Sequence, residues 1–233
     1  MALLLTPQAA FSENSFCLNS QYLEISFYSN GDLGTEAESD FASISYGNNF
    51  SFAGEWNTFS SIRLGDETEE FTAAIDFWPE VLDPENSRFS FGNKLSYHYL
   101  DYGRWCIEND ILFEPFLKYT GEHDWYLKFS IGFAIKEQKL KVLNQWLDNT
   151  SFTADIEFDK KFSESFEAFF IFSTHDEYRY YLFPSPLYTL GVAYTFDNRL
   201  RLQASYQLYC CDMFISKVFL DGDQFKCGIR LYL

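Results

Sequence analysis

Hydrophobic and polar residues alternate along most of this chain. In the segment 187–196 every second residue is hydrophobic, and the same pattern holds across 199–210. Successive side chains of a β-strand point to opposite faces, so each segment predicts a strand with one apolar and one polar face. Asp197 and Asn198 lie between the two segments. Because both residue types tolerate a positive φ, they predict a tight hairpin turn.

The same alternation predicts twelve strands over the whole chain. Several of them have ten residues or more, which is long for a strand of a β-sandwich. That length suits a strand that crosses a membrane at a tilt of about 40°. The predicted strands are 20–30, 40–48, 50–58, 68–78, 89–100, 104–119, 124–137, 150–160, 164–174, 187–196, 199–210 and 223–233.

Residues 226–233 of the last predicted strand carry a spaced motif. Lys226 is followed two positions later by Gly228 and three positions after that by Leu231, and Leu233 ends the stretch. The motif resembles the C-terminal signal of bacterial outer-membrane β-barrel proteins, in which the final residue is usually aromatic. The resemblance implies a porin-like barrel in the bacterial outer membrane. Its implied partners are membrane lipid and the barrel-assembly machinery, which binds this strand. The motif does not identify a family within the class.

The predicted connections alternate in length, as they do in outer-membrane barrels with short periplasmic turns and long external loops. Two connections depart from this order. Residues 79–88 form a long connection where a short turn is expected, and 101–103 form a short turn where a long connection is expected. Ten strands are therefore an alternative to twelve, and residues 137–147 have an alternative interpretation as a short amphipathic helix. Short turns are predicted near 49, 120–123, 161–163 and 197–198, and longer connections near 31–39, 59–67, 138–149, 175–186 and 211–222.

We therefore predict an all-β fold, a single antiparallel up-and-down transmembrane β-barrel over residues 13–233. No internal repeat, proline-rich linker or low-complexity tract divides this region. Residues 1–12 have two interpretations. They contain a short apolar run followed by small residues up to Ser12, which is typical of a truncated signal segment. The alternative is a disordered tail.

The composition supports a surface that faces lipid. Aromatic residues make up 21% of the chain, with 27 Phe and 16 Tyr, which is more than an ordinary core of this size encloses. A lipid-facing barrel wall accommodates them without a run of 18 apolar residues, because its hydrophobicity is distributed in alternation. The formal net charge of −17 argues against nucleic acid as a partner. Phosphate groups are bound by clustered Lys and Arg.

The polar faces of the strands predict a charged lumen, because a Lys or Arg at mid-depth on the lipid face costs about 2–4 kcal/mol. Acidic residues cluster in 104–119 and 150–160, and basic residues in 199–210 and 223–233. On a closed wall this separation predicts a transverse field that orients polar solutes. Alternatively, the charges pair across a plugged lumen. The predicted lumen-lining residues are Glu108, Asp110, Glu114, Lys128, Lys136, Asp155, Glu157, Asp159, Arg199, Arg201, Lys226 and Arg230.

Other candidate chemistry is sparse. Ser173, Thr174 and His175 lie near a predicted external rim, where barrel lipases and deacylases use a Ser–His arrangement, but no further motif completes it. The five cysteines include no CxxC pair. The acidic stretches 66–70 and 221–224 lack the spacing of a calcium loop and are interpreted as solvated loop charge. We therefore predict no catalytic residue, no metal site and no cofactor.

The sequence leaves three functions open. The first is an outer-membrane barrel that is a porin-like channel for small polar solutes or has a structural role. The second is an outer-membrane barrel enzyme that modifies lipid. The third is a soluble β-barrel that binds an apolar ligand, with the apolar faces pointing inward. Alternation alone does not distinguish the inside of a barrel from its outside.

The membrane-barrel hypothesis predicts heat modifiability. A folded membrane barrel resists SDS until it is boiled, so we expect boiled and unboiled samples to migrate differently in an SDS gel. Identical migration would count against the hypothesis. A protein that stays in solution without detergent would favour the soluble barrel.

Overall fold

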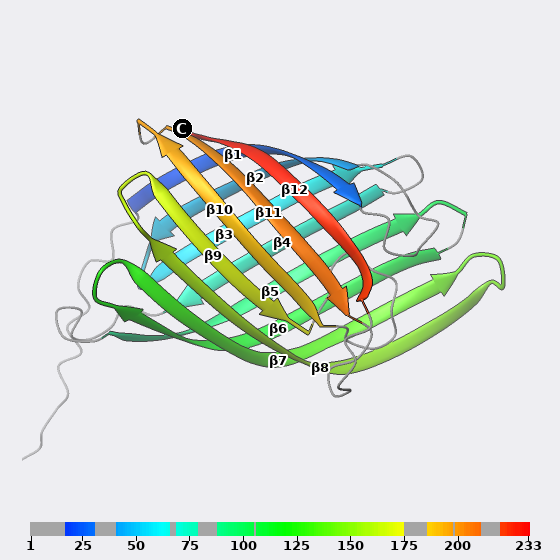
Figure 1. Ribbon diagram of the computed structural model, residues 1–233. Helices are drawn as coiled ribbons and strands as arrows, with labels where there is room; N and C mark the ends of the chain where they lie inside the picture. Colours follow the sequence, from blue (N-terminus) through cyan, green and yellow to red (C-terminus); the bar gives the residue numbers. More distant parts are fainter. Residues whose placement is uncertain are drawn as a thin grey trace, which may run out of the picture.

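Twelve antiparallel strands form one closed barrel in the computed structural model of the chain (Figure 1). The structure describes residues 17–30, 41–65, 69–78, 88–104, 106–174, 186–197, 199–210 and 220–233, so the predicted signal segment 1–12 and His175 lie outside the described residues. The strands are β1 (Cys17–Asn30), β2 (Phe41–Ser51), β3 (Glu55–Leu64), β4 (Glu69–Trp78), β5 (Phe89–Tyr102), β6 (Cys106–Gly121), β7 (Trp125–Leu140), β8 (Gln145–Lys161), β9 (Phe166–Ser173), β10 (Leu187–Phe196), β11 (Leu200–Cys210) and β12 (Leu220–Tyr232).

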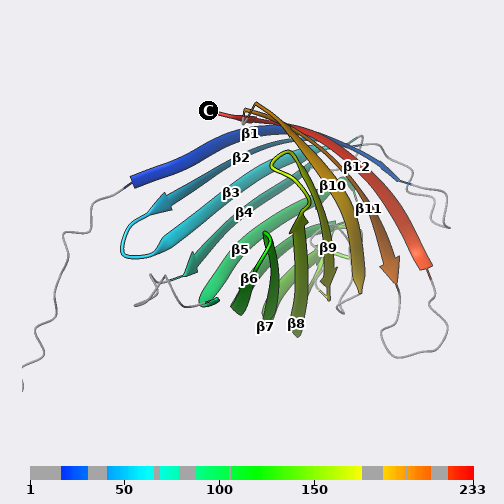
Figure 2. The same cartoon turned by 60° about the vertical axis from the view of Figure 1, so that its left-hand side comes forward.

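The strands follow an up-and-down order around the barrel. Each strand pairs with the strands before and after it in the sequence, and β12 pairs with β1 to close the ring. Figure 2 shows the same tilted strands after a turn of the view. The predicted all-β, twelve-stranded antiparallel barrel is confirmed, and the ten-strand alternative is wrong. We call the end with the turns at 52–54, 122–124 and 162–165 the turn end, and the opposite end the loop end.

The third strand differs from the prediction. It occupies Glu55–Leu64 and not 50–58, because the chain turns at 52–54 and not near residue 49. Ala53 and Gly54 both have a positive φ, of 52° and 142°. The alternation pattern did not signal this turn, since the residues on both sides of it also alternate. The predicted connection near 59–67 is therefore largely strand.

Residues 137–147 form a strand, a turn and a second strand, so the helical alternative is wrong. β7 continues to Leu140, the chain turns through 141–144, and β8 starts at Gln145. Val142 and Leu143 lie at the tip of this hairpin and are exposed. Within the described part of the chain, no helix is long and apolar enough to cross a membrane.

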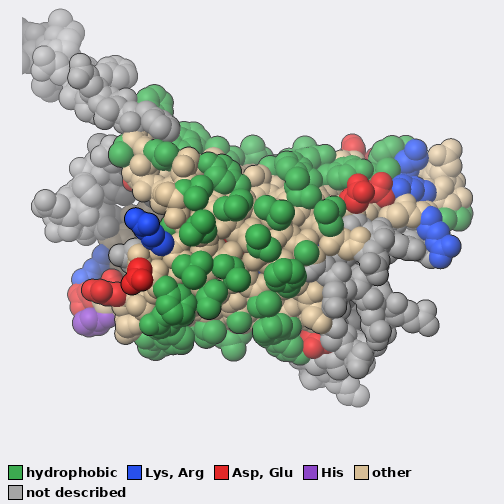
Figure 3. Space-filling model, turned by 90° about the horizontal axis from the view of Figure 1, so that it is seen from above, with side chains coloured by type: hydrophobic (Ala, Val, Ile, Leu, Met, Phe, Trp, Pro, Cys, Tyr) green, Lys and Arg blue, Asp and Glu red, His purple; other side chains and the backbone are tan. Residues whose placement is uncertain are grey.

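The apolar face of the strands points out of the barrel. Phe91, Phe152 and Leu190 are 68%, 85% and 64% exposed, and Figure 3 shows hydrophobic side chains over most of the visible wall. The polar positions between the apolar ones point inward, and Glu24 and Glu108 are 2% and 0% exposed. This arrangement is the reverse of a soluble barrel around an apolar ligand, so that alternative is wrong. An apolar wall of this extent requires lipid or another apolar surface against it.

The outward face of β7 shows the extent of the apolar band. Trp125 lies at the turn end, where its ring centroid is 5.3 Å from Tyr119 and 6.0 Å from Phe158, and such aromatic clusters mark a membrane boundary. The next five outward side chains of β7 are aliphatic or aromatic and are exposed. The band ends toward the loop end at Glu137, which lies opposite Asp148 of β8.

A charge placed in the middle of this band measures the contact with lipid. We expect Ile131→Lys, in the centre of the outward face of β7, to lower the free energy of unfolding by about 2–4 kcal/mol. Glu137→Lys at the band edge is the control, and its expected cost is about 0–1 kcal/mol. Denaturant titration of the two variants in lipid vesicles measures both values. Equal costs at the two positions would contradict a lipid-facing band on β7.

Candidate functional site

Most of the residues predicted to line the lumen lie at inward positions of their strands. Glu108, Asp110 and Glu114 of β6 are at most 1% exposed. Arg199 is different, because it lies in the turn between β10 and β11, is exposed, and donates its backbone N–H to the carbonyl of Phe196 at 3.0 Å. Its place is therefore the turn end of the barrel and not the inner wall.

A buried group of charged residues lies in the half of the lumen toward the loop end. Lys136 Nζ of β7 is 2.8 Å from Glu108 Oε1 and 3.3 Å from Asp110 Oδ2. Gln138, also on β7, donates a side-chain N–H to the other oxygen of Glu108. A single ammonium group therefore lies between two carboxylates of β6.

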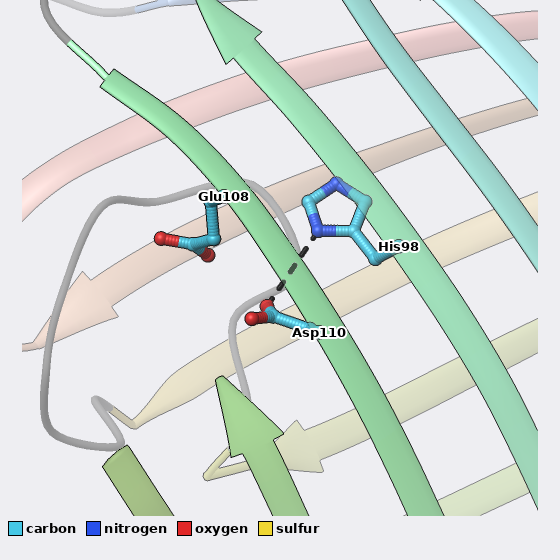
Figure 4. Close-up of side chains that lie close together, drawn as sticks. All are labelled: His98, Glu108 and Asp110. Atoms are coloured by element: carbon cyan, nitrogen blue, oxygen red, sulfur yellow. Dashed lines mark ion pairs between the residues drawn. The ribbon is translucent and has the colours of Figure 1, made fainter. Parts of the chain in front are cut away.

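His98 of β5 joins this group to the next strand. Its Nδ1 is 3.6 Å from Asp110 Oδ2, and its Nε2 is 3.3 Å from Glu70 Oε1 of β4 (Figure 4 shows the contact with Asp110). Glu70 continues the series, because its second oxygen is 3.6 Å from Arg63 NH1 of β3. We call Arg63, Glu70, His98, Glu108, Asp110 and Lys136 the loop-half cluster.

An aromatic ring connects the loop-half cluster to the strands that close the barrel. The guanidinium of Arg63 lies over the ring of Tyr28 at 4.5 Å from its centroid, and Lys226 Nζ is 5.2 Å from the same ring. Lys226 in turn is 3.4 Å from Glu24 Oε1. Charged and aromatic side chains are therefore in contact from β7 round to β12 along the inner wall.

Glu24 of β1 is the centre of the contacts at the closing seam. Arg230 donates from NH2 and Nε to Glu24 Oε2 at 2.7 and 2.8 Å. Gln203 of β11 and Ser26 of β1 each donate to Glu24 Oε1 at 2.7 Å. One buried carboxylate thus links three strands, β1, β11 and β12, where the sheet closes.

The half of the lumen toward the turn end has its own charge pairs. Arg201 of β11 donates from NH2 and NH1 to the two oxygens of Glu167 of β9 at 2.5 and 3.1 Å. Lys128 of β7 is 3.3 Å from Asp76 Oδ2 of β4, which lies three strands away in the wall. The hydroxyl of Tyr126 donates to Glu157 of β8.

Hydroxyl groups donate to one carboxylate of β8 and to one in the middle of β6. Ser173 donates to Asp155 Oδ1 at 2.6 Å, and Thr153 donates to Glu114 Oε1 at 2.7 Å. Lys94 is 3.7 Å from Glu114 Oε2. Ser173, the candidate serine of an outer-wall Ser–His arrangement, therefore points inward and donates to a carboxylate.

The pairing follows the wall more than it crosses the lumen. Among the described residues, most ion pairs join neighbouring strands, such as Lys136 with Glu108 and Arg230 with Glu24. β6 and β12 are six places apart in the closed ring of twelve, so they lie on opposite sides of the lumen. The acids of β6 therefore lie opposite the bases of β12.

The charges of the lumen fall into an enclosed and an accessible set. The side chains of Glu70, Arg63 and Asp110 are 4%, 5% and 1% exposed, so the loop-half cluster is almost completely enclosed. The side chains of Lys226 and Arg230 are 24% and 21% exposed, although both bind Glu24. Lys94 and Asp76, on β5 and β4, are accessible to a similar degree, at 22% and 23%.

A small polar cavity opens toward the turn end. Its volume is about 220 Å³, and its lining includes Glu167, Arg201 and Tyr232 from the inner wall. Lys161 and Glu164 from the end of β8 and the following turn complete its charged rim. The cavity is lined mostly by groups that bind water or a polar solute.

Sequence reasoning placed Glu108, Asp110 and Lys136 of the loop-half cluster at the lumen but missed its other three members. Glu70 belongs to the acidic stretch that was interpreted as solvated loop charge, but it is 5% exposed on the inward face of β4. Arg63 was assigned from the sequence to the predicted connection near 59–67, but in the structure Arg63 belongs to β3. His98 and Asp110 are direct partners in the β5–β6 ladder and lie at equal distances from the intervening turn. Folding the sequence about that turn was the one available signal.

The residues of the predicted C-terminal signal lie on the strand that closes the barrel. Gly228 approaches β1 so closely that an added Cβ would lie 2.6 Å from Ser26 Oγ. Lys226 points inward, and Leu231 and Leu233 point outward and are 44% and 71% exposed. Recognition of this strand by the assembly machinery stays a prediction.

Removal of the Glu24 carboxylate tests its role at the seam. We expect Glu24→Ala to lower the free energy of unfolding by about 3–5 kcal/mol, because Arg230 and Lys226 keep their charges without their carboxylate partner. Glu69→Ala, an exposed residue of the same type, is the control and should change stability by about 0.5 kcal/mol or less. Denaturant titration measures both. Equal stability of the two variants would mean that backbone pairing alone holds the seam.

Comparisons with known proteins place this fold among outer-membrane barrels. The NanC porin superposes on this chain with a TM-score of 0.66 at 9% sequence identity. The superposition covers 91% of this chain and 100% of the NanC chain. The COG4313 outer-membrane channel from Pseudomonas putida F1 has a TM-score of 0.61 at 6% identity over 94% and 97%. The KdgM porin has a TM-score of 0.57 at 10% identity over 90% and 98%.

No protein-family model and no curated protein matches the chain by sequence. The likeness is therefore one of architecture. The chain has the fold of the outer-membrane β-barrel channels, as the alternation and the terminal motif predicted.

Proposed function

We propose that this protein is a porin-like channel of the bacterial outer membrane that passes small polar solutes and prefers cations. The observation that carries the proposal is the two-sided wall. Large apolar side chains are exposed on the outside of a closed barrel, and charged side chains line the inside. Lipid can surround such a wall, and water and ions can occupy its interior.

Accessible charge inside the barrel supports a channel over a purely structural barrel. Lys226 and Arg230 on one side, and Asp76 and Lys94 on the other, keep more than a fifth of their side-chain surface exposed. A lumen filled completely by side chains would bury them. The polar cavity at the turn end is consistent with an entrance to the same passage.

The preference for cations follows from the balance and the placement of the charges. β8 carries Asp155, Glu157 and Asp159 on its inward face, and hydroxyl groups of Ser173 and Tyr126 hold the first two. A hydroxyl donor carries no positive charge, so these hydrogen bonds do not pair either carboxylate with a base. The carboxylates raise the local concentration of cations in a narrow, charged passage.

The solutes of the structural neighbours do not carry over to this chain. One neighbour is the KdgM porin in complex with disordered oligogalacturonate, which is a polyanion. A polyanion needs a predominantly basic wall, whereas the inner wall here mixes both signs with acids in slight excess. Among the described residues, the inward acids include Glu24, Glu55, Glu70, Asp76, Glu108, Asp110, Glu114, Asp155, Glu157, Asp159 and Glu167, and the inward bases include Arg63, Lys94, Lys118, Lys128, Lys136, Arg201, Lys226 and Arg230.

The lipid-modifying enzyme has less support than the channel. The neighbours with similar folds include porins and an outer-membrane channel. The hydroxyl of Ser173 points into the barrel and donates to Asp155, away from lipid on the outer wall. The orientation of Ser173 therefore does not favour attack on a lipid substrate.

Planar-bilayer recording tests both parts of the proposal. We expect the purified protein to produce conductance steps, and its reversal potential in a KCl gradient to have the sign of cation preference. The double variant Asp155→Asn/Glu157→Gln should shift the reversal potential toward zero or beyond, because it removes two lumen charges from β8.

The matched control for this experiment is Asp148→Asn. Asp148 lies on β8 as well, but it is exposed on the outer face near the loop end, so we expect no shift. A heat-modifiable protein that gives no conductance would leave a structural barrel as the function. Steps with an unchanged reversal potential in the double variant would contradict the role of β8 in selectivity.

A further inference from the structure

We propose that His98, Glu108 and Asp110 form a binding site for a divalent transition-metal ion, with zinc as its type. The site lies inside the barrel on the neighbouring strands β5 and β6 (Figure 4). It goes beyond the channel function and does not rest on it, because a barrel without conductance could also bind the ion there.

The three side chains lie close enough together to converge on one metal ion. One donor atom from each lies within 4.8 Å of the others. His98 and Asp110 are opposite each other in the β5–β6 ladder, and Glu108 lies two positions away on the same inward face. Ligand atoms of a tetrahedral zinc ion lie roughly 3.4 Å apart. The distance of 3.6 Å between His98 Nδ1 and Asp110 Oδ2 is close to that value.

Glu70 holds the imidazole in the orientation that a metal requires. Its Oε1 is 3.3 Å from His98 Nε2, so the ring can donate Nε2–H to this carboxylate and present the Nδ1 lone pair toward Asp110. A histidine that binds a metal typically donates its second ring N–H to a carboxylate or a carbonyl. Glu70 is therefore a positioning residue, and the ring is oriented before any ion enters.

Lys136 marks the position where a cation is favourable. Its ammonium lies between Glu108 Oε1, at 2.8 Å, and Asp110 Oδ2, at 3.3 Å. A divalent ion that binds both carboxylates would take over this place. The flexible stem of Lys136 allows the ammonium to move toward the lumen. Gln138 donates to the other oxygen of Glu108 and so holds that carboxylate during the exchange.

Burial and the surrounding negative charge stabilise a cation at this place more strongly than a cation at the surface is stabilised. Glu108, Asp110 and His98 are at most 2% exposed, so the charges in the cluster are only weakly screened. The ion pairs described above bring three carboxylates, Glu70, Glu108 and Asp110, together with two basic side chains, Arg63 and Lys136. An acid-rich, enclosed group of this kind favours the entry of a further cation.

The ligand set points to the class of metal. One imidazole and two carboxylates suit zinc and neighbouring first-row ions, whereas calcium and magnesium prefer oxygen ligands alone. Three protein ligands leave a fourth tetrahedral position for water. The proposed site therefore has the form of an open zinc site and not of a closed structural one.

Cobalt(II) is the probe that tests the site, because its visible absorbance reports coordination by protein ligands. The full chain is folded in detergent, treated with a chelator and titrated with CoCl₂, and then ZnCl₂ is added in competition. We expect one equivalent of cobalt to bind and zinc to displace it.

His98→Gln and Asp110→Asn should weaken binding at least about tenfold, and Glu70→Gln by about 10–100-fold, since outer ligand partners contribute that much. Lys136→Met should strengthen binding, because it removes the competing ammonium.

The matched control is His123→Asn. His123 is exposed in the turn after β6 with a φ of 66°, a conformation that Asn tolerates, so this variant should bind cobalt as the wild type does. Each variant is first checked for folding by its gel shift on boiling, and Asp110→Asn carries the ligand test if His98→Gln does not fold. The proposal is overturned by a wild type without saturable uptake, by full binding in the folded ligand variants, or by weaker binding in Lys136→Met.

Discussion

Closure of the sheet between β1 and β12 is the constraint on which the rest of the structure depends. Inside a membrane no water satisfies the backbone groups of an edge strand, and each unsatisfied group costs several kcal/mol. The antiparallel pairing from Tyr22↔Tyr232 to Asn30↔Gln224 removes both edges. Glu24 adds side-chain contacts to Arg230 and Lys226 across the same seam. One of the two strands that close the sheet, β12, therefore also carries the lumen bases Lys226 and Arg230.

Closure also explains why charge is concentrated and paired inside. Once lipid occupies the outside, every polar face must point to a lumen that only twelve strands enclose. Neighbouring strands bring opposite charges within ion-pair distance, as Lys136 does with Glu108. The result is uneven, because the loop-half cluster is enclosed while Lys226 and Arg230 stay accessible. A passage for solutes and an enclosed cation site can therefore occupy different parts of one lumen.

The strands were predictable because their signals are local. The predicted range 187–196 coincides with β10, since the period of two and the turn residues that follow are both visible in a short window. The prediction of the third strand failed because its turn has no such local signal. The residues on both sides of Ala53 alternate, and the positive φ values of Ala53 and Gly54 mark where the chain reverses. Glu70 was misplaced because a run of acidic residues resembles a solvated loop until the partner strands bury it.

The amino-acid sequence by itself determined the two-faced strands and their hairpin order, and it left twelve or ten strands open. Only the tertiary structure decided that the apolar face is the outer one and which charges meet. Lys128 and Asp76 are 52 residues apart, and Arg230 and Glu24 are 206 apart. The reason is that alternation distinguishes one face of a strand from the other, but a shift of two residues preserves both faces. The register, and with it every contact in the lumen, is set by pairing around the whole closed ring.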